Sequence, residues 1–419
     1  MRYFADLHIH SKYSRAVSPL MDLPHLAEGA KRKGLQILGT GDFTHPLWFK
    51  HLKATLQNES NEGSGLFAYR DVRFMLTAEV ATFKSTPKGV KKVHHVIHAP
   101  SFEVVEQLND VYGKMGSLEA DGRPMFGNCS PAELMEKTHE VSPDAVLIPA
   151  HAWTPWFGIF GSMSGYNSIE EGYEEQAKHI IALETGMSSD PAMNWRLSKL
   201  DKYALMSNSD SHSPYPWRLG RECNVFDFGS NGEASFSSIF SAVKNHDKRH
   251  FLFTVEVDPA YGKYHYDGHR LCNFSASPEE TRKLKSVCPV CHRHLTIGVE
   301  NRVEELADRP LGFVPENAIP FKKVLPLHEL VAAYRKSSLS SKRVMEEADS
   351  LITSVGSELS VLLDTPEPQL RKHADEGLVA VIMRNREGAL KVKPGYDGEY
   401  GVLQLNAATK LGQTTLGAY

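Results

Sequence analysis

The sequence predicts an α/β fold in three parts, and three observations predict it. Short apolar runs alternate with stretches of helical spacing through residue 257, which is the pattern of repeated strand–helix units. Segment 258–312 is rich in Gly, Pro, Cys and His and is too short for an apolar core of its own. Helical spacing then dominates much of segment 313–419. We therefore expect a barrel-like unit (1–257), a small metal-held module (258–312) and a mainly helical domain (313–419).

The composition excludes several classes of protein. The chain has 419 residues, of which 41% are hydrophobic and 23% charged, so a disordered or fibrous chain is excluded. No run reaches the roughly 18 apolar residues of a membrane helix, and the start MRYFADLHIH has no secretory pattern. With five Cys and a net charge of −4, we expect a reduced, cytoplasmic protein that is not basic overall. The unusual count is 20 His, the commonest metal ligand.

The elements of the first unit follow from local patterns. Tyr3 to Ile9 alternates apolar and polar residues as a strand does, and Leu23 to Lys33 has helical spacing that stops at Gly34. Leu35 to Gly39 is a short apolar run, typical of a buried parallel strand. Further strands are expected at Phe74–Val80, Val93–Ala99, Ala145–Ala150 and Ile180–Glu184, with helices at Ser101–Tyr112 and Ser130–His139. These units predict a parallel α/β fold, open or closed into a barrel, with its chemistry at the carboxyl ends of the strands.

The last hundred residues show a different pattern. Helices are expected at Leu327–Lys336 and Ser341–Leu363, and the turn-rich run PGYDGEYG follows them. No internal repeat or low-complexity tract interrupts this segment. A compact helical domain is therefore expected after the Cys/His module.

Histidines and carboxylates recur after successive predicted strands. His8 and His10 are two residues apart on one strand, so both side chains leave the same face. Imidazoles and carboxylates without thiolates suit Zn, Mn, Fe or Mg, and the set is too large for one ion. Two or three divalent ions (Zn, Mn or Mg) would be held as a cluster that clamps the oxygens of a phosphoryl ester. The candidate ligands are His8, His10, Asp42, His45, Glu79, His94, His95, His98, His151, Asp210 and His212.

This ordered pattern resembles the polymerase and histidinol phosphatase (PHP) superfamily, through ADLHIHSKYS, GTGDFTH, TAEV and SDSH. The resemblance implies a distorted seven-stranded β/α barrel with a polynuclear metal centre. It implies as ligands His8, His10, Asp42 or His45, Glu79, His94 or His95, His151, Asp210 and His212. Two departures stand out: Phe43 follows Asp42 where the family often has His, and no His lies between Ser14 and Val17. A barrel with fewer than the full set of ligands is therefore one outcome, and the choice among His94, His95 and His98 stays open.

Four residues of the second part predict a structural zinc site. Cys288 and Cys291 have C-x₂-C spacing, which lets two thiolates reach one tetrahedral ion, and His269 and Cys272 form a second pair upstream. The second pair argues against a redox role for CPVC. With four protein ligands no coordination position is open, so the ion is expected to be structural. Cys129 and Cys223 stand alone and are expected to be small buried residues.

The whole chain also resembles the endonuclease Q family, through runs such as GTGDFTHPLW, HHVIHAPSFE, SNSDSHSPYPWRLGRE, CPVCHRHLTIGVENRVEELADRP and GSELSVLLD. The resemblance implies a DNA-repair nuclease that cuts the phosphodiester 5′ to a deaminated base (uracil, hypoxanthine or xanthine) or an abasic site. The products would carry a 3′-hydroxyl and a 5′-phosphate. Its catalytic residues would be Asp210, His212, Glu79 and His151, with His212 a ligand or the donor of a proton to the leaving group. Damaged DNA is the implied partner, and replication or repair proteins are further partners that the sequence does not identify.

Several residues are candidates for contact with DNA. A nuclease that flips a base stacks it on aromatic side chains, and an aromatic loop follows His151 directly. For the aromatic loop the alternative is simple packing over the barrel mouth. For Arg218 the alternative is a structural salt bridge, and for the basic stretch described next it is a solvated helix face. The stretch Phe321 to Arg343 is strongly basic and could line a DNA channel. The candidates are Trp153, Trp156, Phe157, Tyr215, Trp217, Arg218, Lys322 and Lys323.

Two other functions compete with this interpretation. A PHP small-molecule phosphomonoesterase, similar to histidinol phosphatase, would need the same metals but neither the Cys/His module nor the helical domain. A non-catalytic DNA-binding protein with a decayed barrel would be expected to lose carboxylates, whereas the ligand set here is nearly complete. A helicase is excluded because the sequence has no G-x-x-x-x-G-K-[ST] loop.

Overall fold

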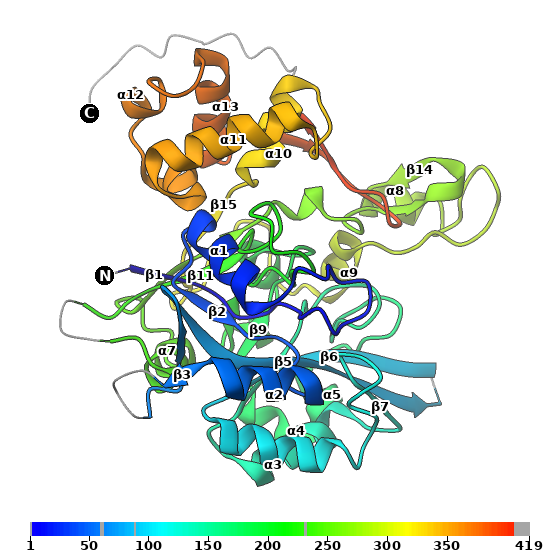
Figure 1. The fold of residues 1–419 in the computed structure, drawn as a ribbon. Coiled ribbons are helices and arrows are strands. Elements are labelled where there is room, and N and C mark those ends of the chain that lie inside the picture. The colour runs from blue at the N-terminus through cyan, green and yellow to red at the C-terminus, as the bar shows by residue number, and fades with distance from the viewer. Residues whose placement is uncertain (1, 59–62, 88, 230–232, 406–419) are drawn as a thin grey trace.

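The computed structural model describes residues 2–58, 63–87, 89–229 and 233–405, and Figure 1 shows their arrangement. A mixed α/β body built from the first part of the chain carries the helical C-terminal domain on one side. The Cys/His module projects from the same body (Figure 1). Within the described residues no helix is both long and apolar enough to span a membrane.

Seven strands form the wall of a distorted barrel, which confirms the predicted fold class. They are β1 (Arg2–Asp6), β2 (Ile37–Gly39), β5 (Val72–Thr86), β6 (Gly89–Ala99), β8 (Val146–Pro149), β9 (Ala182–Glu184) and β10 (Ala204–Met206). β8 meets β9 through the Ala152 N–H, which donates to the Glu184 carbonyl at 2.9 Å. A parallel bridge between Ile9 and Ser211 joins the end of β10 to the end of β1 and completes the ring.

The parallel pairing expected from the strand–helix units holds for only part of the sheet. β1, β2 and β5 run parallel, but β5 and β6 form a long hairpin, and β6 is also antiparallel to β8. The hairpin follows from its short connection, because a parallel crossover needs a dozen or more residues. Because β6 runs in the opposite direction, its first half lies at the end of the barrel where its neighbours finish. This reversal decides which histidine of β6 reaches the metal centre.

Helices cover the outside of the barrel, and capping side chains mark where several of them begin. α1 (Leu23–Lys33) is capped by Asp22 and ends at Gly34, whose φ of 98° is accessible to glycine at little cost. The Ser101 hydroxyl caps α3 (Phe102–Tyr112), and Ser130 with Glu133 forms a capping box on α4 (Pro131–Val141). The other helices of this part are α2 (Pro46–Thr55), α5 (Ile169–Tyr173), α6 (Pro191–Asn194) and α7 (Phe236–Lys244).

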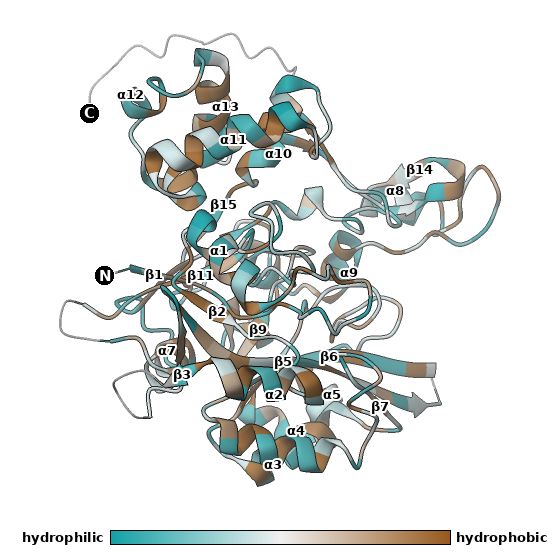
Figure 2. Ribbon diagram, viewed as in Figure 1, coloured by the Kyte–Doolittle hydropathy of each residue, from teal (hydrophilic) through white to brown (hydrophobic). Residues whose placement is uncertain are grey.

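The sheet continues beyond the barrel on the far side of β1. β11 (Cys223–Asp227) and β12 (Phe251–Glu256) add antiparallel strands, and β15 (Phe321–Lys323) pairs with β12 in parallel. The core lies between this sheet and the helices, and in Figure 2 strands β2 and β5 are largely hydrophobic. The free cysteines Cys129 and Cys223 are buried, as expected. Short strands at the other edge are β3 (Gln57–Asn58), β4 (Phe67–Tyr69) and β7 (Met125–Gly127).

The Cys/His module is a small unit next to the barrel. It consists of β13 (Asp267–His269), β14 (Phe274–Ala276), α8 (Pro278–Lys283) and α9 (Val299–Leu306). The C-terminal strands β16 (Lys391–Lys393) and β17 (Val402–Gln404) flank a turn that returns to this module (Figure 1). There the Arg270 N–H donates to Asp397 at 2.7 Å, and the Tyr396 hydroxyl donates to Asn273 at 2.9 Å. The predicted domain boundaries remain predictions, but the last strands lie against the second part of the chain.

Up to residue 405, the C-terminal domain is built from α10 (Leu327–Arg335), α11 (Lys342–Val355), α12 (Glu367–Leu370) and α13 (Glu376–Arg386). The helix expected at Ser341–Leu363 is wrong in its second half. α11 ends at Val355 because Gly356 has a φ of 113°, and a π-helical turn at Ser360–Asp364 follows. In Figure 2 hydrophobic residues occur on the sides where these helices meet. The helical character of the domain is confirmed.

A buried ion pair attaches the helical domain to the barrel. Lys33 on α1 donates to Glu358 at 2.8 Å and to the Pro216 carbonyl at 2.9 Å. Glu358 also accepts a hydrogen bond from the Leu327 N–H at 3.1 Å. The side chains of Lys33 and Glu358 are both buried. The pair therefore joins α1, the loop that follows Asp210, and the start of α10.

We expect Lys33→Met to lower the free energy of unfolding by about 3–5 kcal/mol, because it leaves the Glu358 charge buried without its partner. Urea denaturation at pH 7 measures the loss. The double variant Lys33→Met with Glu358→Leu should recover most of it, since no uncompensated charge remains. A double variant as unstable as the single one would contradict this account of the pair.

The same pair makes stability depend on pH. Burial opposes ionisation of Glu358, but Lys33 and His328 outweigh it and lower its pKa from 4.5 to about 2. Because the pKa is lower in the folded protein, this stabilisation is complete above about pH 4.5 and is lost as the pH falls towards 2.

Candidate metal centre at the barrel mouth

His8 and His10 lie directly after β1, at the carboxyl end of the barrel. β1 ends at Asp6, earlier than expected, and the Asp6 carboxylate accepts hydrogen bonds from the Ser209 N–H and hydroxyl. His8 and His10 are both about 1% exposed. Their rings lie 5.6 Å apart, so the two imidazoles border the same space, as their spacing predicted.

Asp210 completes a first group of potential ligands. Its Oδ1 lies 3.1 Å from His10 Nε2 and 3.8 Å from His8 Nε2. These three side chains each offer a ligand atom within 4.8 Å of the others. Asp210 has a φ of 47°, a conformation that costs a non-glycine residue energy and that clusters at functional sites. The loop after β10 therefore holds this carboxylate over the two histidines.

A second group consists of Glu79, His94 and His151. Glu79 Oε1 lies 2.8 Å from His94 Nδ1 and 3.0 Å from His151 Nε2, and the two ring nitrogens are 3.2 Å apart. The other oxygen, Glu79 Oε2, lies 3.4 Å from His10 Nε2 in the first group. Glu79 therefore joins the two groups through its two oxygens.

The donor set fits divalent metal ions. His8 Nε2 is buried and has no hydrogen-bond partner among the described residues, although it points at carboxylates of both groups. Burial opposes ionisation of Glu79, but His94 and Arg123 hold its pKa well below the usual range. The pKa of Asp210 is also lowered, by His212 and His10 against the effect of burial. Ionised carboxylates and aimed imidazoles are what Zn²⁺ or Mn²⁺ binds.

Glu184 is a part of this centre that the sequence analysis missed. His8 Nδ1 lies 3.0 Å from the Glu184 carboxylate, which also accepts hydrogen bonds from the His151 N–H at 2.8 Å and from Asn208 at 2.9 Å. A carboxylate behind the distal nitrogen fixes the orientation of a ligating imidazole. Its position in the sequence could have identified it, because Glu184 is the last residue of strand β9 and the other members of the centre also lie near strand ends.

Asp42 and His45 lie outside both groups. Asp42 Oδ1 is 3.0 Å from His10 Nδ1, and its Oδ2 accepts hydrogen bonds from the Ser11 N–H and hydroxyl. Asp42 therefore orients His10 in the way that Glu184 orients His8. The His45 ring stacks on Tyr13 with ring centroids 4.4 Å apart. Direct metal binding by either residue remains a prediction, and the contacts assign Asp42 a supporting position.

The structure separates the three histidines of β6. His94 contacts Glu79, but His95 lies on the opposite face, where its ring nitrogens lie 2.7 Å from the Tyr173 hydroxyl and 2.9 Å from the Thr82 hydroxyl. Burial lowers the pKa of His95 to about 3. His98 packs against Phe240 at 5.0 Å, farther from the mouth. Of the alternatives left open by the sequence, His94 is in the group and His95 is not.

His212 lies at the rim of the centre. Its ring is 4.6 Å from that of His10, and its Nδ1 lies 2.9 Å from the Asp210 carbonyl. It belongs to neither three-residue group. Its side chain is 38% exposed, so a substrate could reach it.

The aromatic loop after His151 divides into buried and exposed parts. Trp153 is fully buried, packs on Phe160 at 4.8 Å and donates its indole N–H to Asn194 at 2.8 Å. Phe157 packs on His94 with ring centroids 4.3 Å apart. Contact of Trp153 with a DNA base remains a prediction, and this side chain already has polar and apolar partners in the core. Trp156 is 36% exposed, and its ring packs edge-to-face against the ring of Tyr264.

The loop after His212 exposes an aromatic pair. Tyr215 and Trp217 stack with ring centroids 4.6 Å apart and planes 4° from parallel. Tyr215 is 40% exposed, whereas Trp217 also contacts His328 of the helical domain. Arg218 forms a 3.4 Å ion pair with Glu329, which is the salt bridge that the sequence analysis set against phosphate binding.

The basic stretch Phe321 to Arg343 is partly neutralised. Lys323 lies 3.4 Å from Asp190 and 3.9 Å from Asp258, and Arg335 pairs with Glu347 and Asp375. Lys322 lies over the Phe253 ring at 4.8 Å. These contacts reduce the charge that the stretch can offer to DNA, because several of its cations already have partners.

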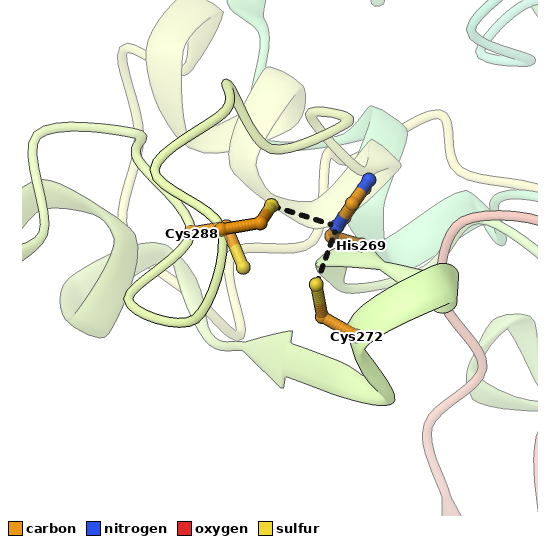
Figure 3. A group of neighbouring side chains, drawn as sticks. His269, Cys272 and Cys288 are labelled. Carbon is orange, nitrogen blue, oxygen red and sulfur yellow. Dashed lines mark hydrogen bonds between the residues drawn. The ribbon is translucent and has the colours of Figure 1, made fainter.

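The four predicted zinc ligands come together in the Cys/His module. His269 Nδ1 lies 3.1 Å from Cys272 Sγ and 3.3 Å from Cys291 Sγ, and with Cys288 all four ligand atoms fall within 4.8 Å of one another. Figure 3 shows His269 and Cys272 on one short segment and Cys288 on another, with the three side chains pointing toward one another. Three thiolates and one imidazole at these distances fit one tetrahedral ion.

Two solved structures resemble nearly the whole chain. The lesion-specific endonuclease PfuEndoQ from Pyrococcus furiosus is 33% identical, with 96% of this chain and 95% of that chain covered and a TM-score of 0.85. Endonuclease Q in complex with a 27-mer duplex that has an abasic lesion at the active site is 32% identical. In that comparison 96% of each chain is covered, and the TM-score is 0.85.

Sequence comparisons add a family domain and two curated relatives. The family described as the MJ0043 C-terminal domain matches residues 326–389. The uncharacterized protein MJ0043 of Methanocaldococcus jannaschii is 31% identical over 253 residues, 60% of this chain, and the match spans 31% of that relative. The uncharacterized protein YqxK of Bacillus subtilis is 25% identical over 417 residues, which cover 96% of this chain and 99% of YqxK.

Proposed function

This chain belongs to the endonuclease Q family, and on that premise we propose that it is a metal-dependent DNA-repair endonuclease. It would nick the phosphodiester 5′ to a deaminated base or an abasic site and leave a 3′-hydroxyl and a 5′-phosphate. The abasic duplex bound by a relative of 32% identity supports damaged DNA as the substrate. The observation that carries the proposal is the pair of ligand groups joined by Glu79 at the barrel mouth.

The proposed ligands are those of the two groups. His8, His10 and Asp210 would hold one ion, His94 and His151 a second, and Glu79 would bridge them. Zn²⁺, Mn²⁺ or Mg²⁺ bound there would lower the pKa of water and neutralise phosphate oxygens. The Cys/His module would hold one structural zinc ion through His269, Cys272, Cys288 and Cys291.

The protein prepares this centre through hydrogen bonds behind the ligands. Glu184 and Asp42 face the Nδ1 atoms of His8 and His10, so both Nε2 atoms point into the centre. Because all four side chains are buried, their orientation is set by the fold before any substrate arrives. His212, which is exposed at the rim, would donate a proton to a leaving group or contact a phosphate.

Aromatic and basic side chains at the rim would contact DNA. Tyr215 and Trp156 retain exposed ring surface on which a base or sugar can stack. Within the basic stretch, Lys322 lies over the Phe253 ring. It has no carboxylate partner among the described residues. Arg218 and Lys323 would have to leave their carboxylates first, so we expect smaller effects from their replacement.

A nicking assay tests the function directly. Duplexes labelled at the 5′ end and carrying uracil, hypoxanthine or an abasic analogue are incubated with the protein and Mn²⁺ or Mg²⁺. We expect one cut on the 5′ side of the lesion and no cut in the undamaged duplex. Rapid hydrolysis of p-nitrophenyl phosphate with every duplex left intact would instead indicate a small-molecule phosphomonoesterase.

A further inference from the structure

Arg123 is a basic residue at the metal centre that belongs to neither ligand group. Its Nη1 donates to Glu79 Oε2 at 3.1 Å. The Glu79 side chain is fully buried, whereas the Arg123 side chain is 30% exposed. The guanidinium therefore spans the distance between the bridging carboxylate and the open mouth of the barrel.

The neighbouring residue, Gly122, brings this arginine close to the centre. The Gly122 N–H donates to the Tyr13 carbonyl at 3.1 Å, and the Gly122 carbonyl accepts a hydrogen bond from the Thr44 hydroxyl at 3.1 Å. A methyl group at this position would collide with the Ser14 hydroxyl and the Asp42 carboxylate. Glycine therefore allows the loop to close onto the segments that follow β1 and β2.

Asp121 holds the loop from the other side. Its Oδ1 accepts hydrogen bonds from the Arg15 N–H at 3.1 Å and from the Arg123 N–H at 3.3 Å. Residues 121–123 are thus attached to the same two segments that carry His10 and Asp42. These hydrogen bonds fix the backbone that carries Arg123, and so they determine where its guanidinium lies.

The guanidinium retains donors for a ligand. Arginine has five N–H donors in one plane, and in the described part of the chain the bond to Glu79 is the side-chain hydrogen bond that Arg123 makes. The carboxylate to which the guanidinium is bonded, Glu79, is one that bound metal ions would neutralise. A planar cation next to a metal centre matches the oxygens of a phosphate group in charge and geometry.

We propose that Arg123 binds a non-bridging oxygen of the phosphodiester that this centre cleaves. The inference rests on the proposed nuclease function and adds a catalytic residue to it. The guanidinium would hold the phosphate over Glu79 and stabilise the negative charge that grows on its oxygens during cleavage. The competing role is purely positional, in which Arg123 only orients Glu79 for metal binding.

Phosphate binding separates these roles without relying on DNA cleavage. Inorganic phosphate is titrated into the Mn²⁺-loaded protein by calorimetry, with metal content measured on the same samples. Arg123→Gln should weaken phosphate binding by about 10-fold or more while keeping the metal content of the wild type. Arg123→Lys keeps the charge but not the fork of donors. Its phosphate affinity should therefore lie between that of the wild type and that of Arg123→Gln.

Arg15 provides the matched control. It is 81% exposed, lies 3.9 Å from Asp121 in the same loop network and does not contact Glu79. Arg15→Gln removes the same charge nearby and should leave phosphate affinity and metal content unchanged. In single-turnover nicking of an abasic duplex, Arg123→Gln should lower the rate by about 10²–10³-fold with little change in duplex affinity.

The outcomes distinguish the two levels of inference. Equal phosphate affinity in wild type and Arg123→Gln would overturn the role of Arg123, as would a wild type that binds no phosphate at millimolar concentration. A loss of metal together with phosphate binding would assign Arg123 to positioning Glu79 instead. A wild type that binds phosphate but nicks no damaged duplex would overturn the proposed function while leaving the phosphate contact standing. Should Arg123→Gln fail to fold, Arg123→Lys decides the same question.

Discussion

Replacing Glu79 with Gln should lower the rate of nicking by about 10³-fold or more, because it removes the charge that joins the two ligand groups. An amide of the same size still accepts hydrogen bonds through its oxygen. It cannot, however, offer two anionic oxygens to two cations. We therefore expect metal content to fall together with activity, and both are measured on the same preparation by mass spectrometry and single-turnover nicking.

The supporting carboxylate Glu184 is the control for this variant. Glu184→Gln also removes a buried charge near the centre, but the residue contacts His8 from behind and not from the side of the ions. Loss of such a supporting partner costs about 10–100-fold in metal affinity or activity. An effect of Glu184→Gln equal to that of Glu79→Gln would contradict the separate roles assigned to the two residues.

Replacing Cys288 with Ser should remove the zinc ion from the Cys/His module and unfold that module. A structural zinc site contributes roughly 10 kcal/mol to the folding of a small zinc domain, and residues 258–312 offer little apolar core to replace it. We expect a loss of one zinc ion per chain by mass spectrometry. Limited proteolysis should then cut within the module in the variant but not in the wild type.

The damage should extend to the C-terminal strands. Asp397 and Tyr396 are hydrogen-bonded to Arg270 and Asn273 of the module, so β16 and β17 should also become sensitive to protease. Cys129→Ser is the matched control, because it makes the same chemical change at a buried free cysteine on the barrel. An unchanged zinc content in Cys288→Ser, or a protease pattern equal to that of Cys129→Ser, would contradict the predicted zinc site.

Local signals in the sequence predicted local structure well. α1 ends at Gly34 as its spacing indicated, and α3 and α4 begin next to the expected starts at Ser101 and Ser130. Caps depend on contacts within a few residues, so the sequence contains all the information that they need. Strand direction depends on partners far along the chain, which is why a parallel sheet was expected where β5 and β6 form a hairpin.

The sequence by itself determined which chemistry the protein carries. Imidazoles and carboxylates after successive strands predicted a metal centre, and two short pairs of His and Cys predicted a metal-held module. Residue type and position at strand ends predicted the metal centre, because the carboxyl ends of barrel strands meet at one mouth wherever the strands lie in the chain. Residue type and the spacing within each pair predicted the Cys/His module.

Only the tertiary structure decided the role of each side chain. It placed His94 rather than His95 beside Glu79, put Asp42 behind His10, and brought Glu184 and Arg123 to a centre in which the sequence had given them no part. These choices depend on the direction in which a side chain points and on contacts between residues far apart in the chain. Neither can be read from spacing, because both are set when the strands pair and the loops close over the mouth.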